Sequence, residues 1–188
     1  MSRKTDVLQI KKAKSFGGEI LVPGDKSISH RAVMLAAISN GPCRVDGFLP
    51  SNDCLSTVGA IRALGIQVDI LDEDKYGPNR LMVHGRGGKF TPPKEDIDCG
   101  NSGTTMRLLS GILAGQKFTS ALVGDESLSQ RPMQRIIEPL KLMGCEIIAS
   151  GKNNSAPLTI HGADLESVRY ELPIASAQVK SAIMLAGL

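Results

Sequence analysis

Three stretches of this chain share one plan, in which small and polar residues open an apolar, helix-like run. Residues 24–35 and 100–109 place Arg31 and Arg107 at the same point of the plan, 76 residues apart. Residues 176–185 start it a third time, 150 residues after the first stretch and so close to twice that spacing. Internal repetition at a fixed period predicts a fold built from copies of one supersecondary unit.

The unit itself alternates helices and strands. In the first copy we predict helices at 27–39 and 51–64 and strands at 43–49, 66–71 and 81–84. The second copy repeats the order, with helices at 104–114 and 132–143 and strands at 118–123, 145–149 and 158–161. Two stretches rich in Gly, Pro and charge, 72–79 and 85–94, are expected to be surface loops.

This order predicts an α/β fold of repeated βαβαββ-like units, with helices packed against small sheets. The pattern leaves open whether the sheets are parallel or mixed. The third copy reaches residue 188 after a single helix, so we expect an incomplete domain.

Composition limits the partners. A net charge of +3, no Trp, two Tyr and four Phe give poor support to nucleic-acid binding. No apolar run approaches the roughly 20 residues that span a bilayer, and the start lacks the apolar core of a secretory signal. The thiols and imidazoles are widely spaced, which favours reduced cysteines in a cytoplasmic protein and gives no metal-binding pattern; they are Cys43, Cys54, Cys99, Cys145, His30, His84 and His161.

The sharpest candidate site is the first helix opening. Ser27 and Arg31 are four residues apart and share a helix face, with Lys26 at the mouth of the helix. An ammonium, a hydroxyl and a guanidinium fork at a helix start suit a phosphate or a carboxylate. The same residues also fit a solvated helix start with a capping serine and two surface cations.

The other openings carry weaker candidates. Asn101 and Gly103 lie in a loop whose glycines allow backbone N–H groups to approach a ligand, although an ordinary turn and cap explain the loop as well. Arg131 precedes a helix-starting proline, and its alternative is a plain surface cation. Ser176 and Gln178 open the third helix, where capping alone explains them. Adjacent Asp125 and Glu126 fit a solvated turn better than an acid/base pair, and we expect Cys99 and Cys145 in the core.

Four ordered motifs between residues 21 and 182 resemble the 5-enolpyruvylshikimate-3-phosphate synthase family. They are Leu-Val-Pro-Gly-Asp-Lys-Ser-Ile-Ser-His-Arg at 21–31, Gly-Asn-Ser-Gly-Thr-Thr-Met-Arg at 100–107, Gln-Arg-Pro-Met at 130–133, and Ser-Ala-Gln-Val-Lys-Ser-Ala at 176–182. The resemblance implies transfer of the enolpyruvyl group of phosphoenolpyruvate to the 5-hydroxyl of shikimate 3-phosphate, with release of phosphate. It further implies the shikimate route to chorismate and the aromatic amino acids, no metal or organic cofactor, and a cytoplasmic monomer.

By resemblance, Lys26 would be catalytic and would contact both substrates. The residues at shikimate 3-phosphate would be Lys26, Ser27, Arg31, Ser176, Ala177 and Gln178. Those at phosphoenolpyruvate would be Lys26, Asn101, Gly103, Arg131 and Gln178. Many family members carry a second serine where this chain has Ala177, so a contact there would come from its backbone.

The family architecture has two similar domains, each of three βαβαββ units in a pseudo-threefold arrangement, with the ligands in the cleft between them. Residues 1–22 would then cross to the second domain, and 23–188 would form an incomplete first domain of two and a fraction repeats. We expect residues 1–188 alone to be inactive, because the family's acid/base groups lie in the second domain.

Three other functions stay open from the sequence. The enolpyruvyl transferase that acts on UDP-N-acetylglucosamine shares the fold, but its signature has Lys-Asn where this chain has Lys26-Ser27. A second alternative is a non-catalytic module that binds an anionic ligand with one half of a binding site. A nucleic-acid-binding relative of the fold is disfavoured by the mild charge and the few aromatic residues.

Overall fold

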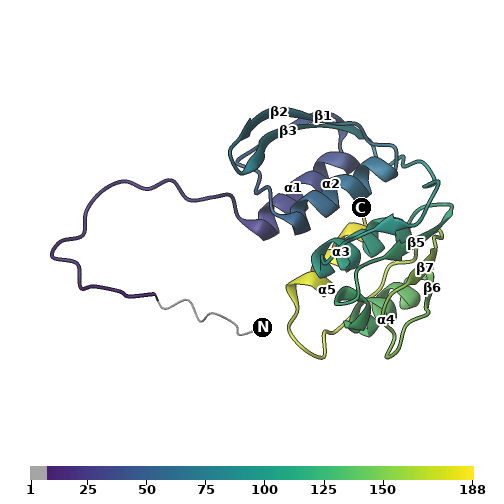
Figure 1. Cartoon of the computed structure of the whole chain (residues 1–188). Helices are drawn as coiled ribbons and strands as arrows, with labels where there is room; N and C mark the ends of the chain where they lie inside the picture. Colours follow the sequence, from purple (N-terminus) through teal and green to yellow (C-terminus); the bar gives the residue numbers. More distant parts are fainter. Residues whose placement is uncertain (1–7) are drawn as a thin grey trace.

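The computed structural model of the protein describes residues 8–188. Two copies of the predicted unit follow one another, and a fifth helix closes the chain (Figure 1). The first copy contains α1 (Lys26–Ile38), β1 (Asn40–Asp46), α2 (Asn52–Ala63), β2 (Val68–Asp74) and β3 (Gly77–Arg86). The second contains β4 (Ile97–Asp98), α3 (Gly103–Ala114), β5 (Thr119–Val123), a 3-10 turn (Leu128–Gln130), α4 (Gln134–Leu142), β6 (Glu146–Ala149) and β7 (Leu158–His161), before α5 (Ala177–Ala186).

The sheet topology confirms the repeat. The first sheet has the order β1-β3-β2, and the second has β4-β5-β7-β6, so that β5, β7 and β6 take the places of β1, β3 and β2. These three strands pair antiparallel in both sheets. The short β4 pairs parallel with β5, which makes the second sheet mixed and completes a βαβαββ unit.

The helices begin where the sequence offers a polar cap. Asp25 accepts a hydrogen bond from the backbone N–H of Ile28 at 2.8 Å, at the start of α1. Serine hydroxyls do the same at the three other helices that have a side-chain cap, α2, α3 and α5, through Ser51, Ser102 and Ser176. Each cap satisfies one of the unpaired N–H groups of a first turn and leaves others available.

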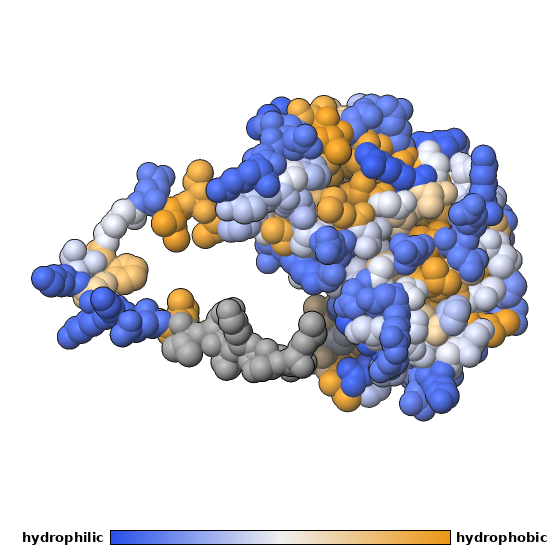
Figure 2. Space-filling model, viewed as in Figure 1, coloured by the Kyte–Doolittle hydropathy of each residue, from blue (hydrophilic) through white to orange (hydrophobic). Residues whose placement is uncertain are grey.

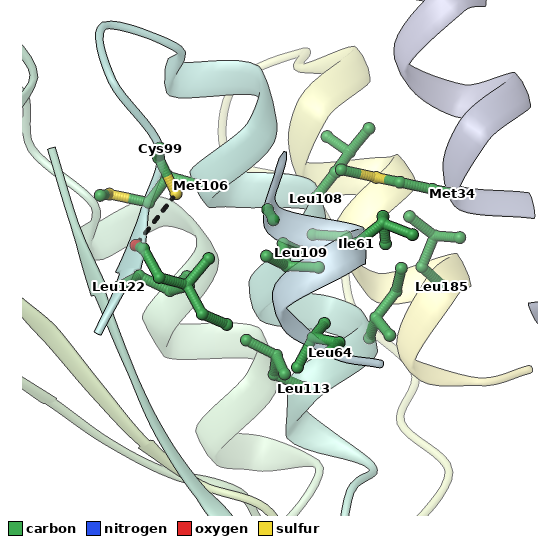
Figure 3. Packing of buried hydrophobic residues seen from close by; sticks show 14 of the residues in the cluster. Met34, Ile61, Leu64, Cys99, Met106, Leu108, Leu109, Leu113, Leu122 and Leu185 are labelled. Carbon is green, nitrogen blue, oxygen red and sulfur yellow. Dashed lines mark hydrogen bonds between the residues drawn. The ribbon is translucent and has the colours of Figure 1, made fainter. Parts of the chain in front are cut away.

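One hydrophobic core joins the two copies. The first sheet covers α1 and α2, and α3 and α5 pack together beneath them (Figure 1). Figure 3 shows Met34, Ile61, Leu109 and Leu185 meeting from these four helices, and the first three are fully buried. A Cβ on Gly111 of α3 would lie 2.1 Å from the carbonyl oxygen of Ala182 on α5, so glycine there allows the two helix backbones to touch. The helix openings are therefore held in fixed relation.

Two expectations about loops were wrong in part. Residues 72–74 belong to β2, while 77–79 and 85–86 belong to β3. Backbone pairing of the antiparallel hairpin continues to Asp74 and Gly77, on either side of a turn at Lys75 and Tyr76. The sequence did not indicate strands here because the side chains on this part of the hairpin are polar and exposed. They lack the alternation of apolar and polar residues that is typical of a half-buried strand. The strand expected at 43–49 is β1 at Asn40–Asp46, because residues 40–42 pair with 84–86.

The described part of the N-terminal segment, residues 8–22, contains no helix or strand and extends away from the folded body (Figures 1 and 2). Its large apolar side chains are exposed, among them Phe16, Ile20 and Leu21. The predicted crossing segment also includes residues 1–7, which lie outside the described residues. No helix within 8–188 has the length and apolarity to cross a membrane.

Candidate active site

The first opening places Lys26 against an acidic partner on α2. Its ammonium forms an ion pair with Asp53, whose side chain is 24% exposed whereas that of Lys26 is 50% exposed. Asp53 lies in the first turn of α2, next to the capping Ser51. Lys26 thus has a fixed direction while half of its side chain stays accessible, as a ligand-binding cation requires.

Arg31 connects the first opening to the third. Its Nε and Nη2 donate to the hydroxyl of Ser181 on α5 at 3.2 and 2.8 Å, and its Nη1 donates to the carbonyl of Ser27 at 3.1 Å. Ser181 in turn donates its own proton to the carbonyl of Ala177 at 2.8 Å. Ser27 and Ala177, two predicted ligand residues, thus hold this network through their backbones, and both side chains are exposed.

The second opening contains a chain of hydrogen bonds that ends at a cation. Asp125 accepts from the Nδ2 of Asn101 at 2.6 Å and from the backbone N–H of Leu128 at 2.8 Å. The Asn101 hydrogen bond, followed by that of Leu128, holds the pKa of this exposed carboxyl below its usual range. The Oδ1 of Asn101 accepts from Arg131 at 2.5 Å. Asp125 therefore orients Asn101, and Asn101 orients Arg131.

Arg107 joins the second opening to the third. Its Nη1 donates to Gln178 Oε1 at 2.9 Å, and the Nε2 of Gln178 donates to Thr104 Oγ1 at 3.0 Å. Burial lowers the pKa of Arg107, and the charges of Arg131 and Arg135 lower it further. A cation that is desolvated near other cations favours an anionic ligand.

Gly103 lies between the two arginines of this opening. A Cβ at this position would come within 2.7 Å of Nη1 of Arg107 and 3.5 Å of Nη1 of Arg131. The absence of a side chain therefore leaves room for both guanidinium groups at the start of α3.

Several groups in this arrangement were missed from the sequence: Asp53, Thr104, Arg107 and Ser181. Arg107 ends the motif at 100–107, and its place opposite Arg31 in the repeat was a usable signal. Ser181 lies at the place of Arg31 in the third copy, but a serine opposite an arginine does not by itself predict a contact between them. Asp53 is 27 residues from Lys26, and nothing in the sequence pairs them.

The thiols and the buried histidine do not fit catalytic groups. Burial raises the pKa of Cys99 to about 12 and that of Cys145 to about 11, and both side chains are buried, as predicted. A thiol with a raised pKa is a poor nucleophile. His30 is fully buried, and burial lowers its pKa to about 4, so it is neutral near pH 7. Within residues 8–188 no group of three His, Cys, Asp or Glu side chains is arranged to hold a metal ion.

Fold and site together define a class of protein: a repeated βαβαββ α/β protein whose polar helix openings bring cationic side chains together. A family model described as EPSP synthase (3-phosphoshikimate 1-carboxyvinyltransferase) matches residues 10–188. This chain belongs to that family.

Curated relatives and solved structures agree with the family match. A 3-phosphoshikimate 1-carboxyvinyltransferase from Thermodesulfovibrio yellowstonii is 52% identical over 180 residues, which cover 95% of this chain and 41% of the relative. One from Akkermansia muciniphila is 53% identical and covers 93% of this chain and 40% of the relative. The EPSP synthase structure from Acinetobacter baumannii superposes with a TM-score of 0.83 at 47% identity, over 91% of this chain and 38% of that one. The chain therefore spans about two fifths of the length of these relatives.

Proposed function

We propose that this chain contributes the first-domain half of an active site that transfers the enolpyruvyl group of phosphoenolpyruvate to the 5-hydroxyl of shikimate 3-phosphate. The products are 5-enolpyruvylshikimate 3-phosphate and inorganic phosphate. The names of the relatives support this reaction, and none of those cited names the UDP-N-acetylglucosamine enzyme. The activity belongs to a protein of the relatives' length, and residues 1–188 alone are expected to be inactive.

One observation carries the proposal: the cations of the three openings outnumber their carboxylate partners. Within residues 8–188, Lys26 pairs with Asp53, but no carboxylate lies within ion-pair distance of Arg31, Arg107 or Arg131. Partly buried cations without carboxylates are stabilised by an anionic ligand. Shikimate 3-phosphate and phosphoenolpyruvate each carry a phosphate and a carboxylate, so the two substrates together match this excess.

The proposed roles are those that the family resemblance implies, and the grouping of these side chains at the helix openings supports them. Arg31, with Ser27 beside it, holds the carboxylate end of shikimate 3-phosphate, and the α5 opening at Ser176, Ala177 and Gln178 holds its phosphate and ring. Asn101, Gly103 and Arg131 line the phosphoenolpyruvate site, with Gln178 between the two substrates.

Lys26 faces both substrates and neutralises the charge that develops on phosphoenolpyruvate during addition and elimination. No step of this scheme requires a metal or an organic cofactor. We further propose a cytoplasmic monomer in which residues 1–22 pass to a second domain and residues 23–188 belong to the first.

The test is the affinity for shikimate 3-phosphate of a protein of the relatives' length that carries these residues. Arg31→Ala removes a charge-assisted contact, worth about 1.5–3 kcal/mol, so calorimetry should show binding weaker by roughly 10- to 150-fold. Arg44→Ala is the control, since Arg44 is an exposed arginine whose partner is Asp46 on the same strand. Equal affinities in the parent and Arg31→Ala proteins would reject the assignment of this half-site.

A further inference from the structure

We propose that Ser181 of α5 is a positioning residue that aims the guanidinium of Arg31 at the carboxylate of the bound substrate. The inference rests on the proposed function of Arg31 and adds a residue that acts only through it. The two positions are 150 residues apart and occupy equivalent places in the first and third copies of the repeat. The contact therefore joins α1 to α5 at the same level of both helices.

The hydrogen-bond geometry of Arg31 carries the argument. The hydroxyl oxygen of Ser181 accepts from both Nε and Nη2, and so occupies the side edge of the guanidinium. The carbonyl of Ser27 takes one N–H of Nη1. A guanidinium has five N–H groups, so one remains on each terminal nitrogen. Those two N–H groups suit the fork-to-fork contact that binds carboxylates.

Ser181 is itself fixed, which allows it to fix Arg31. Its proton is donated to the carbonyl of Ala177 one turn earlier, so the lone pairs of its oxygen face the arginine. A carboxylate at this position would pair with Arg31 and compete with the ligand for its charge, whereas a hydroxyl orients the guanidinium and leaves that charge uncompensated. Long side chains lose considerable rotamer freedom on binding, and orientation before binding reduces that loss.

The hydrogen bond can be observed without any ligand. In the ¹⁵N-labelled 188-residue chain, we expect the Nε–H of Arg31 to exchange slowly with solvent. Ser181→Ala should abolish this protection and Ser181→Thr, which keeps the hydroxyl, should retain it. Fast exchange in the parent chain would overturn the inference irrespective of the enzyme's activity.

The functional consequence is measured in a protein of the relatives' length. Ser181→Ala should weaken shikimate 3-phosphate binding by roughly 5- to 10-fold, with Ser181→Thr within about twofold of the parent. Binding of phosphoenolpyruvate alone should not change. In an Arg31→Ala background, Ser181→Ala should have no further effect, because a positioning residue has nothing left to position.

A matched control separates this role from helix stability. Ser110 on α3 donates to the carbonyl of Met106 one turn earlier, as Ser181 does to Ala177, but no arginine donates to it. Ser110→Ala should leave both affinities unchanged. If Arg31→Ala weakens binding and Ser181→Ala does not, the positioning role is wrong while the proposed function stands. If neither substitution weakens binding, the proposed function fails first.

Discussion

The openings of α1 and α3 occupy equivalent places in the repeat and use them differently. Arg31 and Arg107 correspond to each other, and each donates to the first two turns of α5, to Ser181 and Gln178 respectively. At α1 the first-turn residues Lys26, Ser27 and Ile28 are exposed, so the ammonium of Lys26 lies at an accessible surface. At α3 the capping Ser102 and Gly103 are buried, and Gly103 lies beside the guanidinium groups of Arg107 and Arg131.

The difference shows how one repeated frame presents cations in two different settings. Long cationic side chains at an exposed opening can adjust their positions to the charged groups of a ligand. At a buried opening with glycine, the guanidinium groups have little room to move, so binding depends on where the fold places them. The α5 opening serves both, since it accepts a hydrogen bond from each arginine. Substitutions at α1 should therefore remove charge, and substitutions at α3 should disturb geometry.

The largest effect should come from the α1 side. In a protein of the relatives' length, Lys26→Met should lower turnover by about 100-fold or more, because the lost charge acts on the transition state. Circular dichroism should stay unchanged. Lys117→Met is the control, since Lys117 also pairs with an aspartate, Asp164, on an exposed part of the second copy. Turnover within a few-fold of the parent would return Lys26 to the role of a surface cation.

An intermediate effect should come from the α3 side. Gly103→Ala places a methyl group 2.7 Å from Nη1 of Arg107, so the guanidinium must shift. The shifted group is the end of a flexible side chain, so the fold should tolerate it. We expect phosphoenolpyruvate affinity to fall roughly tenfold, and shikimate 3-phosphate affinity much less.

Gly59→Ala supplies the control for a glycine within a helix. A Cβ at Gly59 of α2 meets nothing within 4 Å. It should leave both affinities intact. If Gly103→Ala weakens the two substrates equally, the two openings do not serve separate ligands, and the comparison between them breaks down.

The smallest effect concerns a buried chain of hydrogen bonds that joins α1 to α3 through α2, and its contribution to the free energy of unfolding. His30 of α1 hydrogen-bonds with Thr57 at 2.6 Å, and Thr57 with Thr105 of α3 at 2.7 Å, within the core. Burial lowers the pKa of His30 from 6.5 to about 4. Between these values the unfolded chain takes up a proton that the folded chain does not, so the free energy of unfolding should fall as the pH drops from 6.5 to 4.

Denaturant titrations across that range can isolate the histidine. His30→Asn and His30→Gln should show a shallower decline in unfolding free energy than the parent, because the titrating group is gone. Identical slopes for parent and His30 variants would show that the buried link does not respond to pH in this window.

Much of the fold could be predicted from sequence because its signals are local. The boundaries of 158–161 matched β7, and the expected polar openings at Ser51 and Ser176 cap α2 and α5. The caps of α1 and α3 are Asp25 and Ser102, each two residues before the helix start that the sequence predicted. The strands at 66–71 and 81–84 were predicted, but the outer part of the β2–β3 hairpin was not, since backbone pairing rather than side-chain alternation stabilises it. The two-residue β4 is too short to show any pattern.

Site residues could be predicted from the sequence only where they lie within a recognisable motif. The sequence indicated Lys26, Arg31, Asn101 and Arg131, but not the groups that orient Lys26, Arg31 and Asn101. Asp53, Ser181 and Asp125 act across 27, 150 and 24 residues respectively, through pairings that tertiary packing creates. The sequence does not distinguish such side chains from other polar residues until the fold brings each one to the group that it orients.

The most direct test of the account is a titration of the ¹⁵N-labelled 188-residue chain with shikimate 3-phosphate, followed residue by residue by NMR. The central claim is that the three helix openings form one anion site. Shifts should concentrate in the first turns of α1 and α5 and at the Nε–H of Arg31, and phosphoenolpyruvate added afterwards should shift the start of α3 and Arg131. Shifts confined to the cleft formed by residues 21–24, 47–51 and 74–79, or no shifts at millimolar ligand, would contradict it.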